Sequence, residues 1–175
     1  MITIKVNLDN LIAIRRRLDA FEQDKTEVMG GIAGVLAEAV ERGFENEADP
    51  VTGVKWASLS PVTEARRKKA GHNGKILQVH GHLADSFQQF NDAHSAGVST
   101  NAVYATTQHF GAARGQFGLT GWGAFGRAGR GQPIPWGNIP ARPIMPIDAD
   151  GNIHKDDEDA IVDVLRIALE SVFGD

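Results

Sequence analysis

Histidines are the first residues whose type and spacing could do chemistry. His80 and His82 are separated by one glycine, and His72 lies nearby in the sequence. On a strand, such a pair projects both rings to one side, an arrangement that zinc sites use. No aspartate or glutamate stands at a recognised metal-site spacing from them, and Gly81 between them favours a turn. We therefore expect ordinary surface or packing histidines, with no metal site and no cofactor.

Nucleophilic and acid–base catalysis also lack a complete set of residues. Ser86 follows Asp85, but no Gly-x-Ser-x-Gly elbow surrounds it and no third partner can be named. No pair of carboxylates stands out by its spacing for glycoside hydrolysis. The chain has no cysteine, which excludes disulfides, thiolate metal sites and thiol catalysis. The sequence therefore predicts no catalytic residue and no enzyme.

A segment rich in glycine and arginine is a candidate for contact with nucleic acid. Residues 126–131 read Gly-Arg-Ala-Gly-Arg-Gly, and two aromatic residues come just before them. Arginine can contact phosphates, and aromatic rings can stack on bases. The chain as a whole is acidic, however, whereas DNA-binding domains usually carry a broad basic face. A flexible interaction loop with incidental arginines is the favoured interpretation, and DNA contact through Arg114, Arg127 and Arg130 is the alternative.

Charge is distributed unevenly along the 175 residues of the chain. Eighteen lysines and arginines against 22 aspartates and glutamates give a formal net charge of −4. The 55 residues from Ala93 to Ile147 contain no aspartate or glutamate and carry +4, so the remainder carries −8. A chain that presents one basic and one acidic face is suited to head-to-tail association of identical copies, and also to binding a polyanion.

Length and hydropathy favour one globular domain over residues 1–175. A domain of this size buries about two-thirds of the surface that its unfolded chain exposes, and a hydrophobic fraction of 42% is ordinary for globular proteins. The longest apolar runs are a few residues, far below the roughly 20 that a membrane span needs. The N-terminus lacks the basic and apolar segments of a secretory signal. We expect a soluble protein with no membrane partner.

The hydrophobic pattern predicts a mixed α+β fold: an N-terminal strand and helical hairpin, a small antiparallel sheet, a long loop rich in glycine and proline, and a C-terminal helix. Alternating apolar or β-branched residues indicate the strands, and apolar spacings of three and four indicate the helices. A Ser-Pro pair at Ser60 favours the start of a short helix, and Gly71 favours its end. The expected elements are a strand over 2–6, helices over 8–22, 25–44 and 60–70, strands over 96–100 and 103–108, and a helix over 156–173.

Glycine and proline crowd into one segment. Eight of the 20 glycines lie between Gly111 and Gly131, mixed with aromatic residues, and five of the seven prolines lie between Pro133 and Pro146. A glycine-rich stretch of this length is too long for an ordinary connection, and closely spaced prolines hold a chain extended. We expect residues 111–147 to form an extended interaction loop or arm.

An ordered set of short phrases gives the chain a resemblance to a known family. The phrases are Phe44, Asp49-Pro50, Gly53, Trp56, Leu59-Ser-Pro-Val-Thr63, Ile76-Leu-Gln78, Gly81-His-Leu83, Ser86, Asn101, Tyr104-Ala105, Gln108-His-Phe-Gly111 and Ile134-Pro-Trp-Gly-Asn-Ile-Pro-Ala-Arg-Pro143. Together they resemble the tailed-phage virion morphogenesis, or tail completion, family over about residues 40–147. His80, Gln108-His109 and Ile144 depart from the usual family pattern without affecting the expected fold.

The resemblance implies a structural, non-catalytic protein of the phage head–tail junction. Proteins similar to this one are expected to form rings, commonly hexamers, that complete or terminate the tail or neck so that filled heads can join tails. The implied partners are further copies of the chain, the tail tube and the head–tail connector, with contact to packaged DNA as the alternative. The implied location is the neck or tail of the virion, after assembly in the host cytoplasm.

Interface residues are expected in the arm, because tryptophan and arginine are common hot-spot residues. An extended proline-rich chain also loses little entropy on docking. For Trp136, burial against its own domain is an equally good expectation. The residues expected at the interface are Trp122, Phe125, Arg127, Arg130, Trp136 and Arg142.

Overall fold

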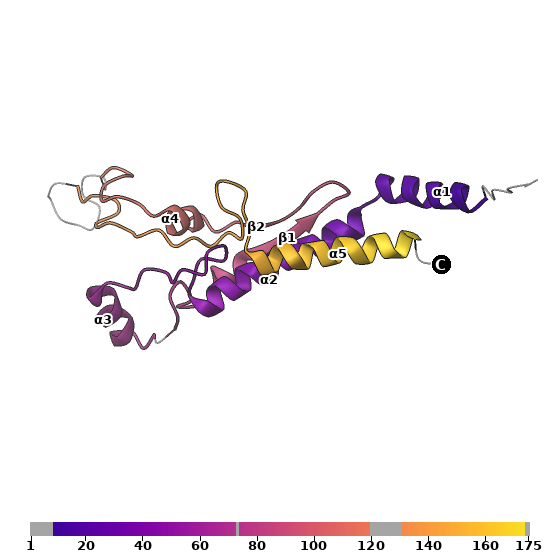
Figure 1. Ribbon diagram of the computed structural model, residues 1–175. Coiled ribbons are helices and arrows are strands. Elements are labelled where there is room, and N and C mark those ends of the chain that lie inside the picture. Colours follow the sequence, from indigo (N-terminus) through magenta and orange to yellow (C-terminus); the bar gives the residue numbers. More distant parts are fainter. Residues whose placement is uncertain (1–8, 73, 120–130, 174–175) are drawn as a thin grey trace, which may run out of the picture. The chain divides into compact units, whose positions relative to one another are not determined.

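Helices dominate the fold, and the sheet is small. The computed structural model describes residues 9–72, 74–119 and 131–173. Within these ranges, five α-helices, one 3-10 turn and a two-stranded antiparallel sheet confirm the mixed α+β class (Figure 1). The elements are α1 (Asp9–Gln23), α2 (Thr26–Asn46), α3 (Pro61–Lys69), η1 (Ala84–Ser86), β1 (Phe87–Asn91), β2 (Ala96–Thr100), α4 (Ala105–Phe110) and α5 (Lys155–Phe173). No helix among these residues is long and apolar enough to cross a membrane.

Most of the predicted elements are confirmed within two residues of their expected bounds. Helices predicted over 8–22, 25–44, 60–70 and 156–173 correspond to α1, α2, α3 and α5, and the strand predicted over 96–100 is β2. The N-terminal strand expected over 2–6 lies outside the described residues.

The chain divides into two compact units, which are described separately. Unit 1 comprises Met1–Glu38, Gln88–Ser99 and Lys155–Asp175, and unit 2 comprises Ala39–Phe87 and Thr100–His154. Helix α2 and the β1–β2 hairpin contribute residues to both. Neither unit is a separate stretch of chain, and the expectation of one domain stays a prediction.

Helix α5 packs against α1 and α2 in unit 1 (Figure 1). A Cβ added to Gly31 of α2 would stand 2.8 Å from Cγ1 of Val164 on α5, so glycine permits an approach that a larger residue would prevent. Helix α1 also contacts α5, and Arg17 Nη1 donates to the Val172 carbonyl oxygen at 3.4 Å. The buried hydrophobic residues of the described part of unit 1 are Val28, Ala33 and Val172.

An aspartate turn closes the β1–β2 hairpin. Asp92 N donates to Ser95 O at 2.9 Å, and Asp92 Oδ1 accepts from the His94 and Ser95 N–H groups at 2.7 and 2.8 Å. Asn91 Nδ2 donates at 2.9 Å to the carbonyl oxygen of Thr26, at the start of α2. The sequence pattern does not predict β1, because the two phenylalanines of this strand are three residues apart, which is not the period of a strand.

The strand predicted over 103–108 is wrong, because Ala105–Phe110 form helix α4. Ala105 N donates to Ala102 O at 2.9 Å in the turn that starts the helix, and the Ala105 side chain is buried. Valine, tyrosine and threonine in this segment favour a strand, but that preference spans only about 1 kcal/mol and yields to packing.

Unit 2 contains a cluster of packed aromatic side chains. Phe44, near the end of α2, meets Trp56 edge-on at a centroid distance of 5.5 Å and Phe87 at 5.9 Å. Gln78 Nε2 donates to the Phe44 carbonyl oxygen at 2.7 Å, which satisfies an acceptor that the end of the helix leaves open. Leu83, which belongs to the same unit, is 2% exposed.

Helix α3 begins and ends where the sequence predicts. Ser60 Oγ accepts from the Thr63 N–H at 3.2 Å, and Gly71 follows the helix with a φ of +77°. Arg67 Nη2 donates to the Gly74 carbonyl oxygen at 2.7 Å and so holds the segment that follows. No residue of α3 is buried.

Candidate functional site

Arg142 anchors the arm, residues 111–147, within unit 2. Its buried guanidinium donates from Nε and Nη2 to the Ala57 carbonyl oxygen at 3.0 and 2.8 Å, and from Nη2 to that of Ser58 at 3.3 Å. Its backbone N–H donates to Gln108 O at 2.8 Å. Burial lowers the pKa of the guanidinium, because the charged form loses hydration. The fork of fixed donors suits this pair of carbonyl oxygens better than a single ammonium group would.

The two residues after Arg142 are also held. Trp56 Nε1 donates to the Pro143 carbonyl oxygen at 2.7 Å, and the Ile144 N–H donates to His109 Nδ1 at 3.0 Å. The Ile144 side chain is 1% exposed. Three successive residues of the arm are therefore fixed to α4 and to the segment that begins at Trp56.

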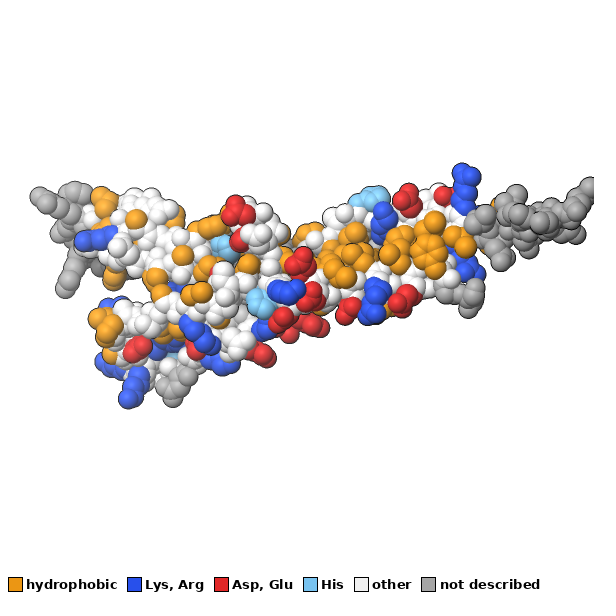
Figure 2. Space-filling view, in the orientation of Figure 1, with side chains coloured by type: hydrophobic (Ala, Val, Ile, Leu, Met, Phe, Trp, Pro, Cys, Tyr) orange, Lys and Arg blue, Asp and Glu red, His pale blue; other side chains and the backbone are white. Residues whose placement is uncertain are grey.

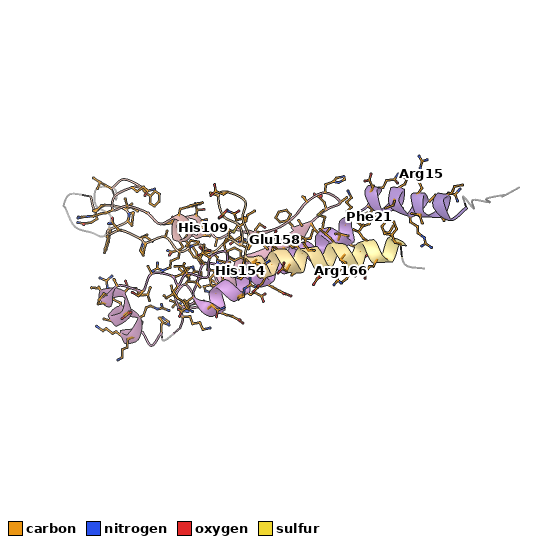
Figure 3. The ribbon with its side chains drawn as sticks, viewed as in Figure 1. Arg15, Phe21, His109, His154, Glu158 and Arg166 are labelled. Carbon is orange, nitrogen blue, oxygen red and sulfur yellow. The ribbon has the colours of Figure 1, made fainter. Side chains whose placement is uncertain are left out.

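His109 is a half-buried acceptor on α4 (Figure 3). Its Nδ1 can accept the Ile144 N–H only while that nitrogen carries no proton. Burial lowers the pKa of His109, and the Asp49 carboxylate partly opposes this effect. The accepted hydrogen bond and the burial both favour the neutral imidazole.

The two halves of the arm pair with each other. Ala112 N donates to Ile139 O at 2.9 Å and Ile139 N to Ala112 O at 2.8 Å, and further along Phe117 N donates to Ile134 O at 2.8 Å. Gly111 has a φ of +73°, and a Cβ there would stand 2.6 Å from Ile139 O. The sequence indicates an extended arm but not this pairing, because the hydrogen bonds are between backbone groups and leave no side-chain pattern.

Two of the six residues expected at an interface lie in the described part of the chain. Trp136 is 60% exposed, whereas Arg142 is buried and its side chain donates within unit 2. An effect of Arg142 on a partner would act through the arm that it holds, and the interface role of both residues stays a prediction. The expected residues that lie outside the described residues are Trp122, Phe125, Arg127 and Arg130.

His72, His80 and His82 lie close together. The rings of His72 and His80 meet edge-on at 4.7 Å, and those of His80 and His82 are 5.7 Å apart. Gly81 has a φ of +76°, which fits the expected turn. Over the ranges that the structure describes, no group of three or more histidines and carboxylates could hold a metal ion.

The residues that carry the family resemblance meet in unit 2. The Trp56 and His109 side chains bind the backbone of Pro143 and Ile144, and the Gln108 carbonyl oxygen accepts from the Arg142 N–H. Residues of the ordered phrases therefore hold the base of the arm in place. The model of the phage virion morphogenesis family matches residues 6–170. The chain belongs to the phage virion morphogenesis family.

Two proteins of known source are similar to this member of the phage virion morphogenesis family. It is 30% identical to the putative capsid assembly protein G of Escherichia phage Mu over 136 residues, which cover 77% of this chain and 73% of that protein. It is 41% identical to Mu-like prophage FluMu G protein 1 of Haemophilus influenzae over 58 residues, which cover 33% of this chain and 39% of that protein. No solved structure matches the chain.

Hollows among the described residues of unit 2 include a groove and a pocket. The larger, of about 590 Å³, is here called the α3 groove; its lining includes Leu59, Pro61, Arg67, Leu77, Ile139 and Pro140. A smaller apolar pocket of about 190 Å³ lies between α4 and Ile144, and its lining includes Phe87, Thr106 and Phe110.

The two units of this family member carry opposite net charges. Unit 1 contains seven lysines and arginines against 14 aspartates and glutamates, whereas unit 2 contains 11 against eight. Unit 1 is therefore acidic and unit 2 basic. The uneven distribution along the sequence becomes a difference between two compact parts of the protein.

Helix α5 carries an apolar stripe that faces solvent. The apolar spacing predicts one face lined by Ile161, Val164, Leu165, Ala168, Leu169 and Val172, but Leu165 and Leu169 are exposed in the structure. Val164 and Val172 pack within unit 1, whereas Val162, Leu165, Leu169 and Phe173 are 55, 37, 40 and 51% exposed and form what we call the outer stripe. Figure 2 shows hydrophobic side chains in a band along the visible face of α5. The signal in the sequence is an apolar sector wider than one helix contact needs.

Proposed function

We propose that this protein is a structural component of the phage head–tail junction. It forms a ring, with six copies as the expected number, that completes or terminates the tail and allows filled heads to join tails. Membership of the phage virion morphogenesis family supports a role in building the virion. The likeness to a phage Mu protein whose name describes capsid assembly supports the same role.

The separation of charge between the two units is the observation that carries the ring. A closed ring needs a heterologous contact, in which two different patches of each copy meet. An acidic unit 1 and a basic unit 2 give every copy two such patches, with attraction between unlike units and repulsion between like ones.

The arm is the part proposed to reach the tail tube or the connector. Its base is fixed in unit 2 by Arg142, Pro143 and Ile144. Its outer part presents Phe117, Leu119 and Trp136 with exposed fractions of 53, 65 and 60%. Large exposed hydrophobic side chains on a fixed base suit a contact with another protein.

The ring is tested by sedimentation of the purified protein at micromolar concentration and by cryo-EM of assembled particles. We expect a discrete oligomer in solution and density for the protein at the neck. A protein that stays monomeric in solution and is absent from virions would contradict the proposal.

The role of the arm is tested by replacing residues 120–130 with a short Gly-Ser linker, which leaves the paired part of the arm intact. We expect an unchanged melting temperature and particles that fail to join heads to tails. A control that carries only Arg114→Ser changes an exposed arginine of the arm outside the expected interface residues and should still assemble. Normal joining with the linker, or loss of the fold, would contradict this role.

A second candidate function is contact with packaged DNA. The excess of basic over acidic residues in unit 2 favours it, and Arg114 is exposed on the arm. The test is binding to duplex DNA at several salt concentrations, with the wild type and an Arg114→Ala/Arg127→Ala/Arg130→Ala variant. Salt-dependent binding that the variant loses would support this function, and no binding at low salt would exclude it.

A further inference from the structure

The outer stripe of α5 is more apolar surface than unit 1 uses. Its four residues follow one another at spacings of three, four and four, so they lie along one side of the helix. The neighbouring side of α5 already packs on Gly31 and α1. An exposed apolar stripe of this length on a folded helix is typical of a surface that meets another protein.

The charge of α5 limits what can cover the stripe. The helix has six acidic and two basic residues. Both basic residues form ion pairs within the helix, Lys155 with Asp159 at 3.4 Å and Arg166 with Asp163 at 2.9 Å. The surplus charge is therefore negative, and the partner surface must combine apolar contacts with positive charge.

Unit 2 has a surface of this kind at α3. The helix has four basic residues against one acidic residue, and none of its side chains is buried. A helix of nine residues is marginal in water without packing, so a docked partner would supply contacts that α3 lacks. The lining of the α3 groove beside it is mixed: it includes apolar residues, among them Leu59, Leu77 and Ile139, and polar or charged residues, among them Asn138 and Arg67.

We propose that the outer stripe of α5 in one copy docks in the α3 groove of the next copy. The basic last turn of α3, of which Arg67 lines the groove, then attracts the acidic residues of α5. This inference rests on the proposed ring and specifies its interface. The contact is heterologous, so each copy uses its stripe on one neighbour and its groove on the other.

The test uses two variants of the full chain. The stripe variant, Val162→Glu/Leu169→Glu, adds negative charge to the outer stripe, and the groove variant, Lys68→Glu/Lys69→Glu, reverses charge at α3. We expect sedimentation to show association weakened about tenfold or more in each. Far-UV circular dichroism and melting must match the wild type, and less drastic Val162→Ser/Leu169→Ser and Lys68→Gln/Lys69→Gln versions replace any variant that does not fold.

Matched controls change the same chemistry elsewhere. Ile167→Glu places a carboxylate on α5 at a site that is 63% exposed but off the stripe. Arg15→Glu/Arg16→Glu reverses two exposed charges on α1, where Figure 3 shows Arg15 pointing away from the helix. Both controls are expected to associate like the wild type.

Mixing the two variants gives the sharpest result. The groove variant keeps an intact stripe and the stripe variant keeps an intact groove, so an equimolar mixture should form heterodimers and stop there. The proposal is overturned if either variant assembles like the wild type, or if the mixture forms no heterodimer. A groove variant that loses DNA binding but still assembles would assign α3 to nucleic acid instead. A wild type that never associates would contradict the ring itself.

Discussion

Arg142 carries a charge that the protein keeps out of water, and its partners are backbone carbonyl oxygens rather than a carboxylate. We expect Arg142→Met to keep the volume but leave the Ala57 and Ser58 oxygens without their donors. The cost should be about 2–3 kcal/mol in the free energy of unfolding, measured by urea denaturation. Arg114→Met, at an exposed position of the arm, should change it by less than about 0.5 kcal/mol. Equal effects of the two substitutions would contradict the anchoring role.

His109 gives the protein a pH dependence whose sign follows from its environment. Burial lowers its pKa in the folded protein, whereas the unfolded chain has the ordinary value of about 6.5. The unfolded state therefore binds the proton more readily, and the stabilisation is complete above about pH 6.5. This stabilisation decreases as the pH falls below about 6.5, and it is lost once the pH has passed below the lowered pKa of His109 in the folded protein.

The measurement is the urea midpoint between pH 7.5 and pH 5 for the wild type and for His109→Asn. Asparagine can place Oδ1 where Nδ1 stands and accept the Ile144 N–H without titrating. We expect the midpoint to fall less steeply with acid in the variant. Parallel curves would show that other groups cause the pH dependence.

At the scale of elements, two glycines of α2 provide a matched pair. A Cβ at Gly31 would stand 2.8 Å from Val164 Cγ1, whereas nothing lies within 4 Å of a Cβ at Gly34. Gly31→Ala should therefore destabilise the protein by about 1–3 kcal/mol through overpacking, and Gly34→Ala should stabilise it by up to about 1 kcal/mol through helix propensity.

Thermal unfolding measures both effects, and a third variant identifies the cause. Gly31→Ala combined with Val164→Ala removes the clashing methyl groups, so the loss should be smaller than the sum of the single effects. If the losses in the free energy of unfolding from Gly31→Ala and Val164→Ala simply add, the two residues do not interact, and the clash between α2 and α5 is not the cause.

The elements also show where reasoning from sequence succeeds. Helices α2, α3 and α5 were predictable because apolar spacing, a Ser-Pro start and a glycine stop act locally. The segment at α4 was wrongly predicted as a strand, because its conformation depends on contacts with distant residues. The Gln108 carbonyl oxygen accepts from the Arg142 N–H, and the His109 ring accepts from the Ile144 N–H. Such contacts between segments more than 30 residues apart leave no periodic signal.

At the scale of the whole molecule, the family and the general kind of function were predictable, but the geometry of the site was not. The ordered phrases pointed to the phage virion morphogenesis family, and the match over residues 6–170 confirms it. Arg142 was expected at an interface because arginine is common in hot spots, yet it is buried. Residue type alone does not separate an arginine that binds a partner from one that binds its own backbone.

Opposite charges on the two units make a prediction about assembly as a whole. If unlike units meet between copies, salt should weaken association, because screening shortens the reach of charge from about 10 Å at 0.1 M to about 3 Å at 1 M. We expect the dissociation constant, measured by sedimentation, to rise about tenfold over this range. Asp159→Asn/Asp163→Asn should reduce the slope, whereas Asp19→Asn on α1 should leave it unchanged. Association that strengthens with salt would show that apolar contact dominates the interface and that charge does not select the partner.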